Sequence, residues 1–216
     1  MDAAAAEKKR CEDRVYLVTG LLLLASEIWK QLVLTFVVGN GTYQWSFIPF
    51  QLCSVPMYIC LLIWVFRNTG FRQAGITFLA DFAFLSGLIV FLDTTGMHYG
   101  YAPLTLHSYL WHFVIAGLGV YSGLAERDRS AAAFLPAAGI YLACCAAAEV
   151  INLGLDRFGP VNMFYINPHY YMNQIVFSSM LGVLSNNAVI AVYIAMTVAG
   201  AFLVHLLWMC IGKRKH

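Results

Sequence analysis

The chain has 216 residues, of which 61% are hydrophobic and only 11% carry a charge. Soluble domains contain about 25% charged residues, so this chain has too few charges to cover a surface in water. The composition therefore excludes an ordinary soluble domain and predicts an all-α polytopic membrane protein. The formal net charge of +2 does not indicate a nucleic-acid partner.

Apolar stretches of roughly twenty residues, the length needed to cross a hydrocarbon core, recur along the chain. We expect six transmembrane helices at residues 15–38, 47–66, 74–92, 105–124, 132–152 and 188–211. The first is too long for a signal-peptide core and lacks a cleavage site, so it is expected to remain in the mature protein. In the long connection 153–187, an apolar patch at Ile175–Leu184 is expected to form a short interfacial or re-entrant helix.

The lysines and arginines fall almost entirely on one side of these spans. Eleven of the 13 lie in the N-terminal segment, the second and fourth connections and the C-terminal segment. The other side holds only Arg157, and Lys30 lies within the first span. The positive-inside rule then places both termini in the cytoplasm.

The domain organisation that follows is simple. Residues 1–14 are expected to form a cytoplasmic N-terminal tail, 15–211 a single six-helix transmembrane domain, and 212–216 a basic cytoplasmic tail. The six cysteines have neither CxxC nor metal-ligand spacing, and Cys11 and Cys210 lie near the ends assigned to the cytoplasm, which argues against a disulfide framework. We expect no metal and no cofactor.

The second span opens with an unusual polar stretch, in which Pro49 and Pro56 bracket Gln51 and Cys53. An unpaired amide in hydrocarbon costs several kcal/mol, so Gln51 is expected to have a partner. The two prolines predict a kinked backbone with open hydrogen bonds. We interpret this stretch as one wall of a polar pocket.

The predicted topology gives the depth of each of the other polar residues in the membrane. Cys53 and His112 lie about six and seven residues inside their spans, at nearly the same level, roughly 10 Å at 1.5 Å per residue. The same outer half holds three further polar residues besides Gln51, namely Lys30, Glu149 and Asn152. A thiol beside an imidazole can form the activated nucleophile of acyl-transfer chemistry.

Each of these residues also has a structural interpretation. A cysteine in a membrane helix commonly acts as a small apolar residue. Glu27 and Lys30 lie on one face of a helix and are interpreted as a structural polar pair. Asp81, in the inner half of the third span, is either a helix-packing hydrogen bond or a proton relay, and His107 is expected to be solvated at the interface.

Several short motifs resemble a known family. Pro49–Ser54 resembles the Pro-Leu-His-Leu-Cys signature of the YwaF-like integral membrane proteins, and His112 matches their Phe-x-x-His motif on the fourth helix. Glu149–Asn152 and Gly159–Tyr165 are similar to their Ile-Asn-Trp and Thr-Asn-Tyr-Met-Tyr segments. The resemblance covers nearly the whole chain.

That family includes a vertebrate transmembrane acyltransferase of ether phospholipids and is distantly related to membrane hydrolases of fatty acid esters. The resemblance implies Cys53 as the acyl acceptor and His112 as its general base. It adds Asn162 to the pocket formed by Gln51, Glu149 and Asn152. Gln51 departs from the histidine of many relatives, and an amide cannot take up a proton. The implied location is the bacterial plasma membrane.

The sequence is therefore interpreted as a membrane enzyme that transfers a fatty acyl group between phospholipids and lysophospholipids. Gln51 or Asn152 would donate hydrogen bonds to the oxyanion, and residues 163–171 would form an outer lid. A hydrolase acting at the same site is the enzymatic alternative. A small proton- or ion-coupled transporter, or a lipid-binding membrane protein, is the alternative from another class, with Glu27, Lys30, Asp81 and Glu149 forming the path.

Overall fold

The computed structural model describes residues 3–125 and 128–213, and throughout these residues every regular element is a helix. The principal helices are α1 (Ala3–Leu32), α2 (Val55–Val65), α3 (Gly70–Phe78), α4 (Phe84–Ile89), α5 (Ala102–Leu124), α6 (Phe134–Leu155), α7 (Ile175–Ser178) and α8 (Asn186–Lys213). Two π-helical segments, η1 (Val33–Val38) and η3 (Leu79–Ala83), extend α1 and join α3 to α4. The remaining elements are short 3₁₀ turns: η2 (Trp45–Phe47), η4 (Val90–Leu92), η5 (Thr95–Met97), η6 (Ala131–Ala133), η7 (Asp156–Phe158), η8 (Met163–Tyr165) and η9 (Ser179–Gly182).

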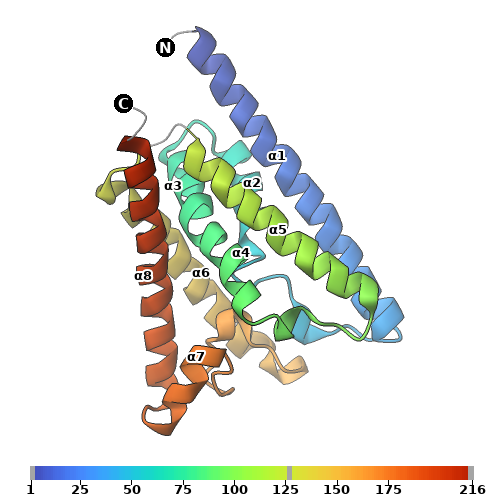
Figure 1. Ribbon diagram of the computed structural model, residues 1–216. Coiled ribbons are helices and arrows are strands. Elements are labelled where there is room, and N and C mark those ends of the chain that lie inside the picture. Colours follow the sequence, from blue (N-terminus) through green and yellow to red (C-terminus); the bar gives the residue numbers. More distant parts are fainter. Residues whose placement is uncertain (1–2, 126–127, 214–216) are drawn as a thin grey trace.

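The long helices run alternately between two ends of an elongated bundle (Figure 1). α1 begins and α8 ends at the same end, and the connections 66–70 and 128–133 lie there as well. The loops around Trp45, Thr95 and Met163 gather at the opposite end, which we call the loop end. Hydrogen bonds join Gln51 and Asn152 to residues 162–164, which follow α6.

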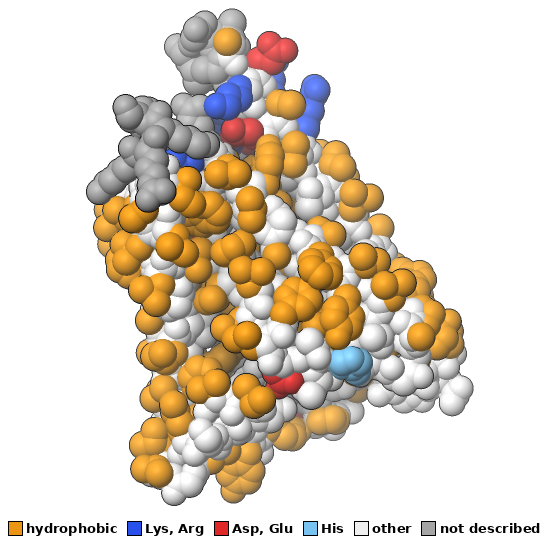
Figure 2. Space-filling model, viewed as in Figure 1, with side chains coloured by type: hydrophobic (Ala, Val, Ile, Leu, Met, Phe, Trp, Pro, Cys, Tyr) orange, Lys and Arg blue, Asp and Glu red, His pale blue; other side chains and the backbone are white. Residues whose placement is uncertain are grey.

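Four helices are long and apolar enough to cross a membrane: Ala6–Val38, Gly70–Leu92, Ala131–Phe158 and Asn186–Gly212. Their outer faces carry large exposed apolar side chains, such as Leu22 on α1, Leu135 on α6 and Leu203 on α8. Figure 2 shows an almost continuous hydrophobic surface between the charged end near the start of α1 and the loop end. These features indicate a membrane protein.

The other two predicted spans differ from these four. α2 has only 11 residues, about 16 Å of helix, because Pro49 holds Ile48 in an extended conformation and the chain becomes helical only at Val55. Pro56 lies in the first turn of α2, where a missing backbone N–H costs nothing. α5 has 23 residues but, with His107, Ser108 and His112, is not among the helices that are apolar enough.

The first residues do not form a separate tail, since α1 is already helical from Ala3. Arg72 at the start of α3 donates hydrogen bonds to Asp13 (2.7 Å) and Glu12 (3.0 Å), and Asp13 is buried. This ion-pair network ties the beginning of α1 to the bundle. Of the predicted C-terminal tail, residues 214–216 lie outside the described residues.

Small residues allow close contact between helices. A Cβ added to Gly119 of α5 would lie 2.5 Å from Phe84 Cβ of α4, and one added to Gly87 would lie 2.8 Å from the backbone nitrogen of Ala116. α4 and α5 therefore touch through their backbones, as small residues permit in membrane bundles. This contact fixes the rotation of α5, and with it the direction of His112.

Candidate functional site

Cys53 lies in the turn that precedes α2. The indole nitrogen of Trp111 donates a hydrogen bond of 2.9 Å to its backbone carbonyl. Its side chain packs, partly buried, against the apolar cluster of Leu23, Met57 and Trp111. Apolar surroundings disfavour a thiolate, so the chemistry proposed for this thiol requires a positive charge or a base nearby.

His112 is buried on α5, one residue after the tryptophan that holds Cys53. Its Nδ1 lies 2.7 Å from the carbonyl oxygen of Ser108. A carbonyl only accepts hydrogen bonds, so Nδ1 carries the proton and Nε2 keeps its lone pair. In this tautomer the ring can act as a base through Nε2. None of the hydrogen bonds among the described residues joins the ring to the Cys53 thiol.

Lys30 connects the two predicted catalytic residues electrostatically. Its ammonium lies 2.8 Å from Oε1 of Glu27, and its side chain is only 14% exposed. The charge of Lys30 acts on Cys53, His107 and His112. The sequence assigned Lys30 to a structural pair. In the structure it is also a positive charge that favours the thiolate form of Cys53.

His107 differs from its predicted solvated state. Its Nε2 is 2.8 Å from the hydroxyl of Ser26, and the ring lies between Trp29 and Trp111, with centroid distances of 5.4 and 5.7 Å. The ring is partly buried between α1 and α5. The position of Ser26 on a neighbouring helix could not be read from the spacing within α5.

Gln51 has the partners that its burial requires, and both are backbone groups of one segment. Its Nε2 donates to the carbonyl of Asn162 (2.9 Å), and its Oε1 accepts from the backbone N–H of Phe164 (2.7 Å). Asn152 binds both backbone groups of Met163 in the same manner, at 3.1 and 2.6 Å. These two amides act as a clamp on residues 162–164.

The clamped segment has a strained backbone. Phe164 and Tyr165 have φ angles of 56° and 59°, in the left-handed region that non-glycine residues rarely occupy. The side chain of Asn162 accepts a hydrogen bond of 3.0 Å from the backbone of Asn167, which closes the loop. Asn162 and Asn152 therefore shape the loop end, and both contribute to its structure.

Glu149 lies on α6, separate from these contacts. It is partly buried, and its Oε2 is enclosed with no hydrogen-bond partner among the described residues. No hydrogen bond within the described part of the chain joins it to Cys53 or His112. Its predicted place in the pocket is not supported by any such contact.

Two phenols interact electrostatically with Cys53: Tyr99, which the sequence analysis did not identify, and Tyr165, which it placed in the predicted lid 163–171. Burial, together with the nearby Cys53 thiol and Glu27 carboxylate, raises the pKa of Tyr99 to about 12. Burial and the same thiol raise the pKa of Tyr165. Both hydroxyls are thus protonated donors at neutral pH. Tyr99 carried no local signal, because its loop is brought to Cys53 only by the packing of α5.

The chain matches no protein-family profile, no curated protein and no solved structure. Fold and site together define a helical membrane protein in which titratable side chains around Cys53 influence one another electrostatically. The Lys30 ammonium acts electrostatically on the Cys53 thiol and on two imidazoles, His107 and His112, and the thiol acts on two phenols, Tyr99 and Tyr165.

Proposed function

We propose that this protein is a membrane-embedded acyltransferase that moves a fatty acyl group from a phospholipid to a lysophospholipid through Cys53. The observation that carries the proposal is electrostatic: the charge of the Lys30 ammonium acts on the Cys53 thiol, and the thiol in turn acts on the phenols of Tyr99 and Tyr165. These are the groups that thiol-based acyl transfer uses, and they lie at one end of an apolar bundle, where lipid headgroups would be. The resemblance to the YwaF-like family supports the same reaction.

The proposed membrane arrangement has six crossings, with both termini in the cytoplasm of a bacterial plasma membrane. Four crossings are the helices that are long and apolar enough. The other two proposed crossings are α5 and α2 together with the turn that precedes it. In support, α1 begins and α8 ends at the same end of the bundle, where Arg67 and Arg129 lie in connections and Arg72 lies in the first turn of α3.

In the proposed first step, Cys53 Sγ attacks the ester carbonyl of the donor lipid and Nε2 of His112 takes the thiol proton. This requires His112 to come within hydrogen-bond distance of the thiol, directly or through one water. The C–S bond forms, the ester C–O bond breaks, and His112 returns the proton to the departing lysolipid oxygen. Tyr99 and Tyr165 would donate hydrogen bonds to the oxyanion, a role the sequence had assigned to Gln51 or Asn152.

Lys30 has a separate role in this scheme. Its ammonium would stabilise the thiolate against the apolar side chains around it. In the second step, the hydroxyl of an acceptor lysolipid attacks the thioester, and its proton passes to the leaving thiolate. A hydrolase would use water in place of the acceptor, so only the second step separates the two enzymes.

The experiment that tests the proposal is mass spectrometry of the purified protein after incubation with a phosphatidylcholine of defined acyl chains. We expect an acyl adduct at Cys53, and its loss as labelled lysolipid is added. Cys53→Ala should abolish both adduct and transfer, whereas Cys144→Ala, at a partly buried cysteine of α6, should abolish neither. An intact acyl-transfer reaction in Cys53→Ala would refute the mechanism.

A further inference from the structure

A pocket of about 340 Å³ opens between α1 and the segment that leads from Tyr43 to Tyr58. This volume lies at the lower end of the range for small-molecule sites, roughly 300–1,000 Å³. Apolar side chains form most of its wall, among them Leu24, Pro49 and Met57. Ile28 and Leu32, exposed by 53% and 52%, flank it on the outer face of α1. The pocket is therefore accessible from the apolar surface of the bundle.

The carboxylate of Glu27 is buried within this wall, with the residue only 3% exposed. Its Oε1 accepts hydrogen bonds from Lys30 Nζ and Gln31 Nε2, both at 2.8 Å. Its Oε2 is buried and has no partner among the described residues. A buried acceptor without a donor is costly, and because Oε2 has less than 1 Å² of accessible surface, a bound molecule can satisfy it only if the carboxylate turns toward the pocket.

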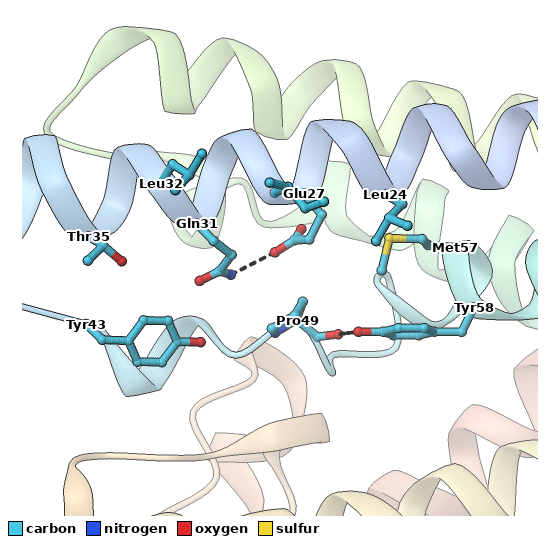
Figure 3. A pocket seen from close by; sticks show the side chains of 10 residues that line it. Leu24, Glu27, Gln31, Leu32, Thr35, Tyr43, Pro49, Met57 and Tyr58 are labelled. Atoms are coloured by element: carbon cyan, nitrogen blue, oxygen red, sulfur yellow. Dashed lines mark hydrogen bonds between the residues drawn. The ribbon is translucent and has the colours of Figure 1, made fainter.

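The opposite wall offers a second polar group. Figure 3 shows Glu27 and Gln31 pointing from α1 into the pocket and the hydroxyl of Tyr43 pointing toward them from the other side. Burial and the Glu27 carboxylate raise the pKa of Tyr43, so its hydroxyl stays protonated. The Tyr58 hydroxyl, by contrast, is engaged with the carbonyl of Pro49 at 2.8 Å.

The pocket adjoins the thiol. Met57 and Tyr58 line it and also belong, with Cys53, to the same packed cluster. Glu27 acts electrostatically on Cys53. A hydroxyl held by Glu27 would therefore lie beside the residue proposed to carry the acyl group.

We propose that this pocket binds the glycerol end of a lysophospholipid, with the Glu27 carboxylate turning to accept a hydrogen bond from its free hydroxyl. The unpaired carboxylate oxygen favours a ligand that donates a hydrogen bond. A diacyl phospholipid has no such donor on its glycerol backbone. The apolar wall and its opening between exposed apolar residues select an amphiphile over a water-soluble alcohol. The site is that of the acyl acceptor, and this assignment of its role rests on the proposed acyltransferase function.

The test measures binding, which does not depend on turnover. Purified protein is titrated with a lysophosphatidylcholine that has a free hydroxyl and with its O-methyl analogue, which lacks the donor. The wild-type protein should bind the hydroxyl form about tenfold more tightly, as expected for a hydrogen bond to a charged group. Glu27→Gln keeps the shape of the side chain but replaces the unpaired carboxylate oxygen with an NH₂ donor. This variant should therefore lose the preference.

Two further variants complete the test. Glu7→Gln, which removes an exposed carboxylate of the same helix, should keep the full preference. Tyr43→Phe keeps the ring and should lower the affinity for the hydroxyl form about threefold, so that the pocket is probed even if Glu27→Gln does not fold. Equal binding of both lipids to the wild-type protein would overturn the assignment.

The outcome is separable from that of the proposed function. If the protein prefers the hydroxyl form through Glu27 but forms no Cys53 adduct, the lysolipid site is supported and the acyltransferase proposal is refuted. A Cys53 adduct in a protein without this preference would keep the acyltransferase and refute the site. Equally tight binding of a single-chain amine would show that Glu27 selects an ammonium, and would overturn the assignment to a hydroxyl.

Discussion

The carboxylate of Asp81 and the imidazole of His205 lie 2.7 Å apart at fully buried positions, although 124 residues separate them in the chain. Asp81 belongs to the π-helical segment η3, and His205 to α8. The second ring nitrogen of His205 lies 3.0 Å from the carbonyl of Ser130 and must donate to it. A second proton lies between Nδ1 of His205 and Oδ2 of Asp81. The pair is neutral overall whether this proton is bound to the imidazole or to the carboxylate.

This sharing predicts the effect of substitutions at Asp81. In Asp81→Asn, the amide can donate to the ring while His205 still donates to Ser130, so the free energy of unfolding should change by less than about 1 kcal/mol. Asp81→Ala removes the partner and should cost about 3–5 kcal/mol. Thermal unfolding in detergent measures both. If Asp81→Asn is fully stable but inactive, Asp81 relays protons, and the transporter interpretation gains support.

The clamp on residues 162–164 is tested by Gln51→Glu. The new carboxylate still accepts from Phe164, but it cannot donate to the carbonyl of Asn162. The loss should destabilise the segment by about 1–3 kcal/mol and speed hydrogen exchange at the Phe164 amide. Gln44→Glu, at an exposed amide in the neighbouring loop, is the matched control. Equal exchange in the two variants would contradict the clamp.

The contact between α4 and α5 makes opposite predictions for two glycines on one helix. Gly119→Ala would drive a methyl group into Phe84 and should cost about 1–3 kcal/mol. Gly117 faces open space, so Gly117→Ala should stabilise α5 by up to about 1 kcal/mol. Melting temperatures of the purified variants give the comparison. A loss of stability in Gly117→Ala as large as that in Gly119→Ala would contradict the packing described.

The proposed topology predicts the positions of reporter fusions. Fusions after residues 70, 128 and 216 should report the cytoplasm, because the basic residues favour retention on that side. Fusions near residues 42, 99 and 160 should report the opposite side, since these loops lie at the loop end. A C-terminal reporter on the external side would refute both the number of crossings and the orientation.

Composition and hydrophobic patterning determined the class and much of the order of elements. The predicted spans 132–152 and 188–211 correspond to α6 (Phe134–Leu155) and α8 (Asn186–Lys213). Helix length follows directly from the number of apolar residues. The same counting predicted that Cys53 lies about six residues inside a helix, whereas in the structure Cys53 lies in a turn and α2 begins only at Val55.

Tertiary structure alone decided which side chains meet. Counting residues places Cys53 and His112 at one level, but the structure sets Trp111 against the backbone of Cys53 and turns His112 toward Ser108. Nothing in the sequence around Asp81 points to His205. The rotation of each helix about its axis depends on close contacts such as that of Gly119 with Phe84, between residues far apart in the chain. The lengths of apolar helices such as α6 and α8 are therefore readable from one sequence, whereas the facing of side chains is a property of the packed bundle.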